Sequence, residues 1–341
     1  ALGFTSVQEL VGRADLLEQI NMTDQIDLSP LFIPAPKNTR RPMQPGVGRM
    51  LARPRNTLSK QITALVSEHT AHGDYELTYV DEQVMAMDRA LGTHLNGAIS
   101  RGEVPNCAEI EAIHLNFSNS AIPGNGLGAF LDEPVNIMVE GGAQDGVAKC
   151  AKGGTLAILK GLNHDGRRLD GSVGKSFAYG AQGGTFIVQG SADSRACIRL
   201  SGADVIFGGE LKEALRDELG GLGARATLKG YACEYMTSGR VIILGDPGPW
   251  MCAGMSGGVI YQRIQPEMNL TVDAIRRRIA KGATVDILEM DERGTADVRE
   301  LLQYYINVLE QYNQPREIAH LHMLIYNPAA HFVKIAVPKR G

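Results

Sequence analysis

Few residue pairs in this sequence have the types and spacing that catalysis needs. Glu234 and Arg240 lie six positions apart and could form a proton-transferring or charge-stabilising pair. A structural ion pair is the more common use of such residues in a folded domain. His320 and His322 are two positions apart, so on a helix their side chains would point apart and would not share a metal ion. The sequence therefore predicts no catalytic residue and no metal site in this chain.

The cysteines are poor candidates for metal or cluster ligands. They are five in number, scattered, and never in CxxC spacing: Cys107, Cys150, Cys197, Cys233 and Cys252. Zinc and iron–sulfur sites usually take ligands from such close pairs. An odd number of scattered cysteines indicates a reducing compartment, where they act as small buried hydrophobes.

Two further features suggest ligand chemistry at first sight. Residues 124–129 read G-x-G-x-G-x, which is neither the dinucleotide fingerprint nor a phosphate-binding loop that ends in Lys-Ser/Thr. His94 follows Asp88-Arg89, but a single histidine beside glycines is more often a structural hydrogen-bonding group. Both are predicted to be structural, the glycines as corners of the chain.

The elements that must position these residues are set by a glycine repeat in residues 135–261. A pair of small residues, usually glycine, precedes four to six aliphatic or β-branched residues and another glycine, as in 183–190 and 238–245. The steps from Gly184 to Gly202 and from Gly239 to Gly257 are both 18 residues. Short strands with glycine turns at this period predict a mainly β fold, a parallel β-helix with several strands in each repeat. The glycines predicted to make its corners are Gly154, Gly184, Gly202, Gly239, Gly245, Gly254, Gly257 and Gly258.

Composition excludes several classes of protein. The chain has 341 residues and a formal net charge of −4, so nothing in its overall charge favours nucleic acid as a partner. No apolar run reaches the length of a membrane span, and the N-terminal residues have no signal-peptide pattern. We expect no membrane contact and a cytoplasmic location.

The chain divides into three predicted parts. Residues 1–57 hold a short helix and an extended arm rich in proline and arginine, 58–265 hold the glycine repeats, and 266–341 form a helical C-terminal cap. Apolar residues within the arm favour contact with a partner surface over a solvated linker. The arginines that would make this contact are Arg40, Arg41, Arg53 and Arg55.

At residues 232–245 and 250–259 the chain resembles the glycine-repeat (GXGXG) domain at the C-terminal end of the glutamate synthase large chain. The resemblance extends to residues 2–13, 88–97 and 266–270 and so covers nearly the whole chain. It implies a right-handed β-helix that packs against two catalytic domains. It also implies a split subunit, or an excised region, of an enzyme that makes glutamate from glutamine and 2-oxoglutarate.

The family's catalytic groups are absent from the matching segments. The glutaminase cysteine, the flavin-binding barrel and the cluster-ligating cysteines of the family lie in other segments. The resemblance therefore implies a non-catalytic structural subunit without a cofactor of its own. Its expected partners in a hetero-oligomer are a glutaminase (amidotransferase) subunit and a synthase subunit with FMN and an iron–sulfur cluster.

Two alternatives remain open at this point. The same repeat fits the glycine-repeat subunit of a formylmethanofuran dehydrogenase or of an N-methylglutamate synthase type complex. A β-helix can also be an enzyme in its own right, such as a polysaccharide lyase or an acyltransferase. Such enzymes need clustered carboxylates, basic residues or histidines on one wall, whereas the repeats here are mostly aliphatic.

Overall fold

The computed structural model describes residues 3–35 and 57–338. The chain forms two compact units, Ala1–Arg55 and Asn56–Gly341. The smaller unit contains the 3₁₀ turns Val7–Leu10, Ala14–Leu16 and Ser29–Phe32 in place of the expected N-terminal α-helix. The four arginines of the predicted arm, Arg40, Arg41, Arg53 and Arg55, lie outside the described residues.

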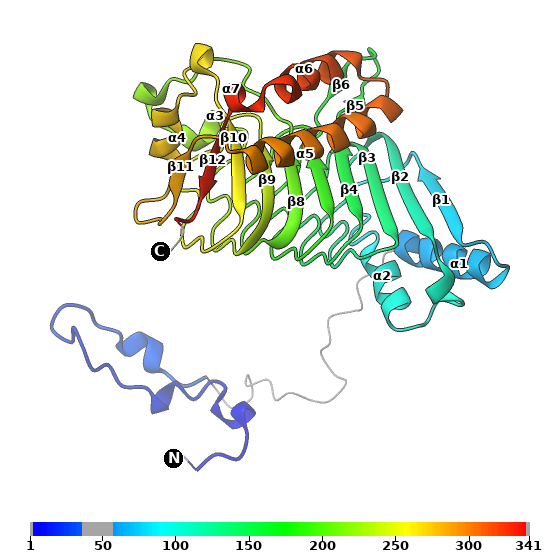
Figure 1. Ribbon diagram of the computed structural model, residues 1–341. Coiled ribbons are helices and arrows are strands. Elements are labelled where there is room, and N and C mark those ends of the chain that lie inside the picture. Colours follow the sequence, from blue (N-terminus) through cyan, green and yellow to red (C-terminus); the bar gives the residue numbers. More distant parts are fainter. Residues whose placement is uncertain (1–2, 36–56, 339–341) are drawn as a thin grey trace. The chain divides into compact units, whose positions relative to one another are not determined.

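The larger unit is built on one ten-stranded sheet with the order β1-β2-β3-β4-β7-β8-β9-β10-β12-β11 (Figure 1). Neighbouring strands from β1 to β10 are parallel, and β12 joins β10 and β11 in antiparallel pairs. The strands are β1 (Glu76–Asp81), β2 (Ala112–Ala121), β3 (Val135–Gly141), β4 (Thr155–Leu159), β7 (Thr185–Val188), β8 (Ser201–Phe207), β9 (Ser238–Ile243), β10 (Val259–Arg263), β11 (Asp286–Leu288) and β12 (Phe332–Ala336). A separate small hairpin pairs β5 (Gly161–Leu162) with β6 (Arg168–Leu169).

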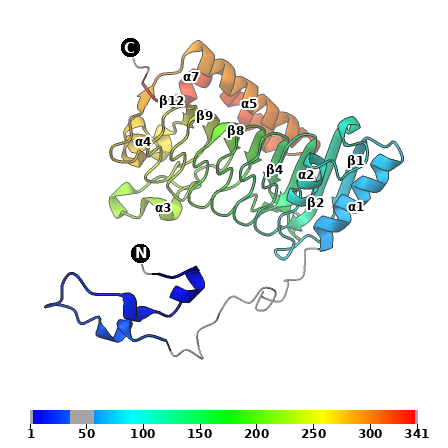
Figure 2. The same cartoon turned by 90° about the horizontal axis from the view of Figure 1, so that it is seen from below.

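Helices lie at both ends of the sheet and along one face (Figures 1 and 2). Beside β1 and β2 are α1 (Thr57–Ala71) and α2 (Thr93–Ser100), and at the opposite end are α3 (Leu222–Arg225) and α4 (Val272–Arg278). The helix α5 (Glu292–Gln311) crosses the strands, and α6 (Pro315–Tyr326) and α7 (Pro328–His331) follow it. Asp291 caps α5, because its carboxylate accepts from the N–H of Gly294 over 2.7 Å.

The predicted fold class, a mainly β, right-handed parallel β-helix, is wrong. The structure is a mixed α/β fold with one mostly parallel ten-stranded sheet and helices packed on it. Each glycine repeat contributes one regular strand to this sheet instead of several. Elsewhere the repeats are turns joined by single bridges, Ala143 to Val173, Val173 to Ala192 and Ala192 to Leu228. The many residues with positive φ in these turns prevent regular strands from forming there.

The parallel strands are buried on both faces, which explains their continuous apolar runs. One face packs against the loops and turns of the repeats, through the buried column Ile137, Leu156, Phe186, Val205, Val241 and Ile260. The other face packs under α5 and α6, through Ala157, Ile187, Ile206, Ile242 and Tyr261. Only the first of these cores follows from the repeat pattern, because α5 lies far away in the sequence.

Three local elements differ from the sequence-based expectation. Apolar residues on one face predict a helix over 210–219, but only the 3₁₀ turn Asp217–Leu219 is regular there. The pattern at 88–99 predicts the edge of a repeat or a hairpin, whereas its second half lies in the helix α2. The sequence predicts that Thr295 caps the long C-terminal helix, but α5 starts four residues earlier, at the cap Asp291. In residues 210–219, Leu215 packs in the core and Asp217 accepts from Arg278 on α4. A regular helix over these residues would not place both side chains toward those partners.

Candidate functional site

Two adjoining cavities lie at the carboxyl ends of the parallel strands. Lys160 follows β4, Gln189 follows β7, Gly208 follows β8 and Leu244 follows β9, and all four line one cavity of about 490 Å³. The side chains of Arg316, Glu317 and His320, on α6, line it from the helical layer. Parallel strands end at the same edge of a sheet, and this edge is where open parallel sheets commonly bind ligands.

Glu210 holds together the charged part of this cavity. Its Oε1 accepts from Nη1 of Arg263 over 2.8 Å and lies 2.8 Å from Nε2 of His320. Burial raises the pKa of Glu210, but the contacts with His320 and Arg263 outweigh it, so the pKa falls below its usual value. A carboxylate held ionised beside a guanidinium and an imidazole is an anchor for the segment after β8 and a poor general acid.

The loop around the β5–β6 hairpin is also tied to the helical layer. Nη2 of Arg168 donates to the carbonyl of Tyr312 over 2.7 Å, and its Nη1 donates to Glu140 and to the carbonyl of Lys160. The polar residues 163–170 predict a surface loop, and most of these side chains are exposed. Arg168 in this loop also connects two distant parts of the same chain.

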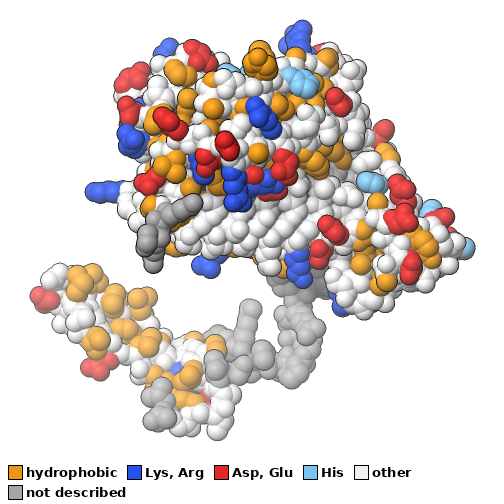
Figure 3. Space-filling view, viewed as in Figure 1, with side chains coloured by type: hydrophobic (Ala, Val, Ile, Leu, Met, Phe, Trp, Pro, Cys, Tyr) orange, Lys and Arg blue, Asp and Glu red, His pale blue; other side chains and the backbone are white. Residues whose placement is uncertain are grey.

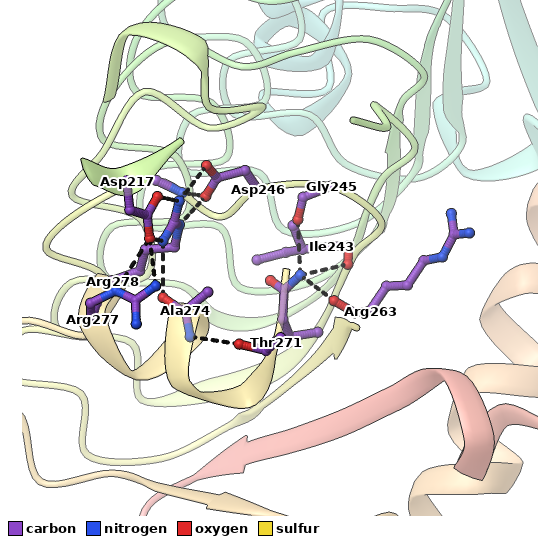
Figure 4. Close-up of polar contacts among 11 residues, drawn as sticks. Asp217, Ile243, Gly245, Asp246, Arg263, Thr271, Ala274, Arg277 and Arg278 are labelled. Carbon is purple, nitrogen blue, oxygen red and sulfur yellow. Dashed lines mark hydrogen bonds and ion pairs between the residues drawn. The ribbon is translucent and has the colours of Figure 1, made fainter. Parts of the chain in front are cut away.

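A second cavity, of about 590 Å³, adjoins the first along residues 210–212. It is lined by Asp217, Asp246 and Arg278, whose contacts are drawn in Figure 4. The Arg278 side chain is only 1% exposed, and its Nη2 donates to Asp217 and Asp246, over 2.9 Å each. The hydrogen bond from Arg278 lowers the pKa of Asp217 to about 2. Every charge in this cluster is matched, so it fastens α4 and the 210–222 segment to the strand end after β9.

The pair Glu234 and Arg240, weighed in the sequence, does not form. Arg240 instead binds Asp204 on the neighbouring strand and Asp297 and Glu300 on α5. Tyr261 donates to Asp297 beside it. Acidic and basic side chains gather on this part of the surface, where α5 crosses the strands (Figure 3). The sequence gives no hint of this network, since residues in direct contact within it lie up to 60 positions apart.

The predicted corner glycines lie in turns next to the strands, except Gly202 and Gly239, which are the second residues of β8 and β9. Gly154 has a φ of +70°, and a Cβ there would overlap the carbonyl oxygen of Val135. Gly202 has no positive φ, but a Cβ would overlap the carbonyl oxygen of Gln182 on the preceding repeat. The positions with positive φ are Gly154, Gly184, Gly239, Gly254 and Gly258, and those that only lack space for a Cβ are Gly202, Gly245 and Gly257.

The cysteines are free thiols, and three of them occupy the core. A hydrogen bond with Cys197 and burial raise the pKa of the Cys233 thiol, and burial raises that of Cys252. Raised pKa values disfavour the thiolate that nucleophiles and cluster ligands need. Within residues 3–35 and 57–338, no group of three or more His, Cys, Asp or Glu side chains is placed to hold a metal ion. Nor does any helix in those ranges have the length and apolar character to cross a membrane.

Comparison with known proteins connects this architecture to one family. The family described as the GXGXG motif matches residues 56–221 and 223–336. Similar curated proteins include "Glutamate synthase [NADH]" of Schizosaccharomyces pombe, 31% identical over 274 residues, which are 76% of this chain and 12% of that protein. "Glutamate synthase [NADPH] large chain" of Bacillus subtilis is 28% identical over 272 residues, which are 76% of this chain and 16% of that one. "Ferredoxin-dependent glutamate synthase" of Antithamnion sp. is 25% identical over 347 residues, 95% of this chain and 21% of that protein. The chain thus spans no more than about a fifth of these relatives.

Proposed function

This chain belongs to the GXGXG family, and from that premise we propose that it is the structural, non-catalytic part of a glutamate synthase-like assembly. The observation that carries the proposal is the agreement between the family match and the relatives. The family covers residues 56–221 and 223–336, almost all of the larger unit, and the relatives named above are glutamate synthases. A chain that matches only 12–21% of those relatives corresponds to one part of such a protein.

In the proposed assembly, other parts carry out the chemistry. A glutaminase part hydrolyses glutamine to glutamate and ammonia. A synthase part, which holds FMN and an iron–sulfur cluster, condenses the ammonia with 2-oxoglutarate and reduces the product to a second glutamate. The chain described here would keep the two sites in register.

The thiols of this chain do not fit an iron–sulfur cluster. Cys197, Cys233 and Cys252 are buried in the core, and the pKa values of Cys233 and Cys252 are raised. Cluster ligands are thiolates, which these surroundings disfavour. This supports the assignment of the cluster to a partner part.

The two cores make the larger unit suitable for holding other domains apart. Each strand from β4 to β10 is fixed by backbone pairing on both sides and by side chains packed on both faces. Close-packed interiors have low compressibility and transmit strain, so the larger unit would act as a stiff body. A displacement of about 1 Å in a reacting group can change a rate roughly a hundredfold, so a rigid spacer has a function without any catalytic residue.

The test uses the intact assembly and separates the transfer of ammonia between the two sites from the chemistry at each site. We would measure glutamate formation with glutamine as nitrogen donor, glutamate formation with added ammonia, and glutamine hydrolysis alone. Weakening the larger unit by Leu302→Ala, in the core under α5, should lower the first rate and leave the other two nearly unchanged. Gln303→Ala, at an exposed position of the same helix, is the matched control. Loss of all three rates in a folded Leu302→Ala assembly, or no glutamate formation in the wild type, would contradict the proposal.

A further inference from the structure

One surface of the repeats is formed by turns with an unusual backbone, here called the turn wall. In each turn, residues with positive φ alternate with residues of ordinary φ, as at Gly146, Ala148 and Cys150 and at Tyr231, Cys233 and Tyr235. The turns of six successive repeats contribute, at residues 126–130, 146–150, 176–180, 195–199, 231–235 and 250–254.

The turn wall is held rigid by its own hydrogen bonds. Gly146 and Cys150 donate their N–H groups to the next repeat, to the carbonyls of Lys175 and Tyr179, over 2.8 Å each. Ala148, between them, donates to the preceding repeat, to the carbonyl of Leu127, over 2.9 Å. The same alternation recurs in later repeats, as from Tyr235 to Ala253 and from Cys233 to Ala196. Side chains carried by this backbone are therefore pre-positioned, which lowers the ordering cost of binding.

Large aromatic side chains stand exposed at one end of the turn wall. Trp250, the only tryptophan in the sequence, is 54% exposed, and Tyr235 is 55% exposed. Tyr231 stacks on Trp250 with ring centroids 5.0 Å apart and an interplanar angle of 25°. Neighbouring repeats thus present a preformed aromatic platform where a stable free surface would be expected to be polar.

Cationic side chains accompany these rings. The guanidinium of Arg199 lies 5.6 Å from the ring centroid of Tyr235, and the ammonium of Lys149 lies 5.3 Å from that of Tyr179. Lys149, Lys175, Arg195 and Arg199 are exposed, and none forms a salt bridge with another residue of the described chain. The charged residues within the turn-wall segments are three cationic ones, Lys149, Arg195 and Arg199, and one acidic one, Glu234, whose pKa is raised by burial against the opposing effect of Arg195. Asp145 and Asp193 lie beside these segments and accept backbone N–H groups. The turn wall therefore carries more cationic than acidic side chains, on a chain whose net charge is −4.

We propose that the turn wall is the docking surface for a protein partner that presents carboxylates beside apolar side chains. Tryptophan, tyrosine and arginine are the residues that most often dominate binding energy at protein interfaces. Arginine and lysine over an aromatic ring attract carboxylates and still pack on apolar groups. This inference rests on the proposed function, since it names the surface through which the chain would hold the glutaminase or the synthase part.

The experiment uses the intact assembly and places a photo-cross-linking benzoylphenylalanine at position 235. We expect cross-links to a segment of the glutaminase or synthase part that contains Asp or Glu beside apolar residues. The same probe at Tyr326, 87% exposed on α6, is the positional control and should give few or none. Cross-links from position 235 to nothing outside this chain, or to a basic segment, would overturn the inference.

Substitutions supply a second readout. Trp250→Ala and Arg199→Glu should lower the ratio of glutamine-dependent to ammonia-dependent glutamate formation by roughly tenfold to a hundredfold. Lys281→Glu, at an exposed position outside the turn wall, should leave the ratio unchanged. Circular dichroism and the urea midpoint of each variant establish that it is folded. A folded Trp250→Ala and a folded Arg199→Glu that both behave like the wild type would overturn the inference.

The two proposals fail in different ways. An assembly without glutamine-dependent glutamate formation contradicts the proposed function, and the docking surface with it. An active assembly in which Trp250→Ala and Arg199→Glu leave the ratio of glutamine-dependent to ammonia-dependent glutamate formation unchanged contradicts the docking surface alone.

Nucleic acid is the competing ligand, because aromatic rings and cations also bind it. Fluorescence anisotropy with a single-stranded oligonucleotide tests for this binding. Binding that depends on Trp250 at physiological salt would assign the turn wall to nucleic acid and overturn the protein-docking inference.

Discussion

Arg240 on β9 lies opposite Asp204 on β8 in the parallel ladder, and its Nη2 donates to Oδ2 of Asp204 over 2.7 Å. Its Nη1 also reaches Asp297 and Glu300 on α5, so one side chain joins two strands to the covering helix. The hydrogen bond that Arg240 donates to Asp204 is the main cause that raises the pKa of Arg240, followed by the one donated to Glu300, and both keep it charged. The contact shows how the helical layer is aligned with the repeats.

We predict that Arg240→Met lowers the free energy of unfolding by about 1–3 kcal/mol, because it leaves Asp204 and Asp297 without their cation. Glu300→Gln, at a side chain that is 66% exposed, should lower it by less than about 1 kcal/mol. Urea denaturation followed by circular dichroism measures both. Equal losses in the two variants would show that the strand-to-helix contact is unimportant.

The second prediction concerns the core under α5. Leu302 is fully buried between α5 and the strands, so Leu302→Ala should lower the free energy of unfolding by about 2–5 kcal/mol. Gln303→Ala, exposed on the same helix, should change it by no more than about 0.5 kcal/mol. If both variants unfold at the same urea concentration, α5 does not form the second core described above.

A third prediction separates the two reasons for glycine in the repeats. Gly202→Ala should cost about 3 kcal/mol or more, because its Cβ has no space beside the backbone of Gln182. Gly166, in the β5–β6 loop, has a φ of +71° and open space, so Gly166→Ala should cost only about 1–2 kcal/mol. Thermal unfolding and soluble yield compare the two. If Gly202→Ala is as stable as Gly166→Ala, the repeats do not pack too closely at position 202 to admit a Cβ.

The fourth prediction is a pH dependence. The pKa of Asp217 is about 2 in the folded chain against an ordinary value of 3.8, so its ionised form is favoured by folding. This contribution is fully present above about pH 4 and is lost as the pH falls from there toward 2. Asp217→Asn should lower stability at pH 7 and flatten the pH profile between 4 and 2. Leu219→Ala, an exposed change in the same turn, should keep the wild-type profile, and a matching loss of pH dependence there would refute the assignment.

The positions of many single elements could be predicted from local pattern. The apolar–polar alternation at 75–80 predicts β1, the same alternation at 110–117 predicts β2, and the periodic apolar residues after 295 predict α5. The candidate site could not be predicted in this way. Arg278 is one of three consecutive arginines, and only its burial against Asp217 and Asp246 distinguishes it from Arg276 and Arg277.

The sequence by itself determined the repeat, its period of about 20 residues, the need for glycine between strands and the resemblance to the GXGXG family. These follow from local sterics and apolar patterning, which act over a few residues. The tertiary structure decided that each repeat forms one strand and that α5 and α6 bury the outer face of the sheet. It also decided that Arg240 pairs with Asp204 and Asp297, and Arg278 with Asp217 and Asp246. Those outcomes depend on contacts between residues far apart in the chain, and local sequence patterns do not predict such contacts.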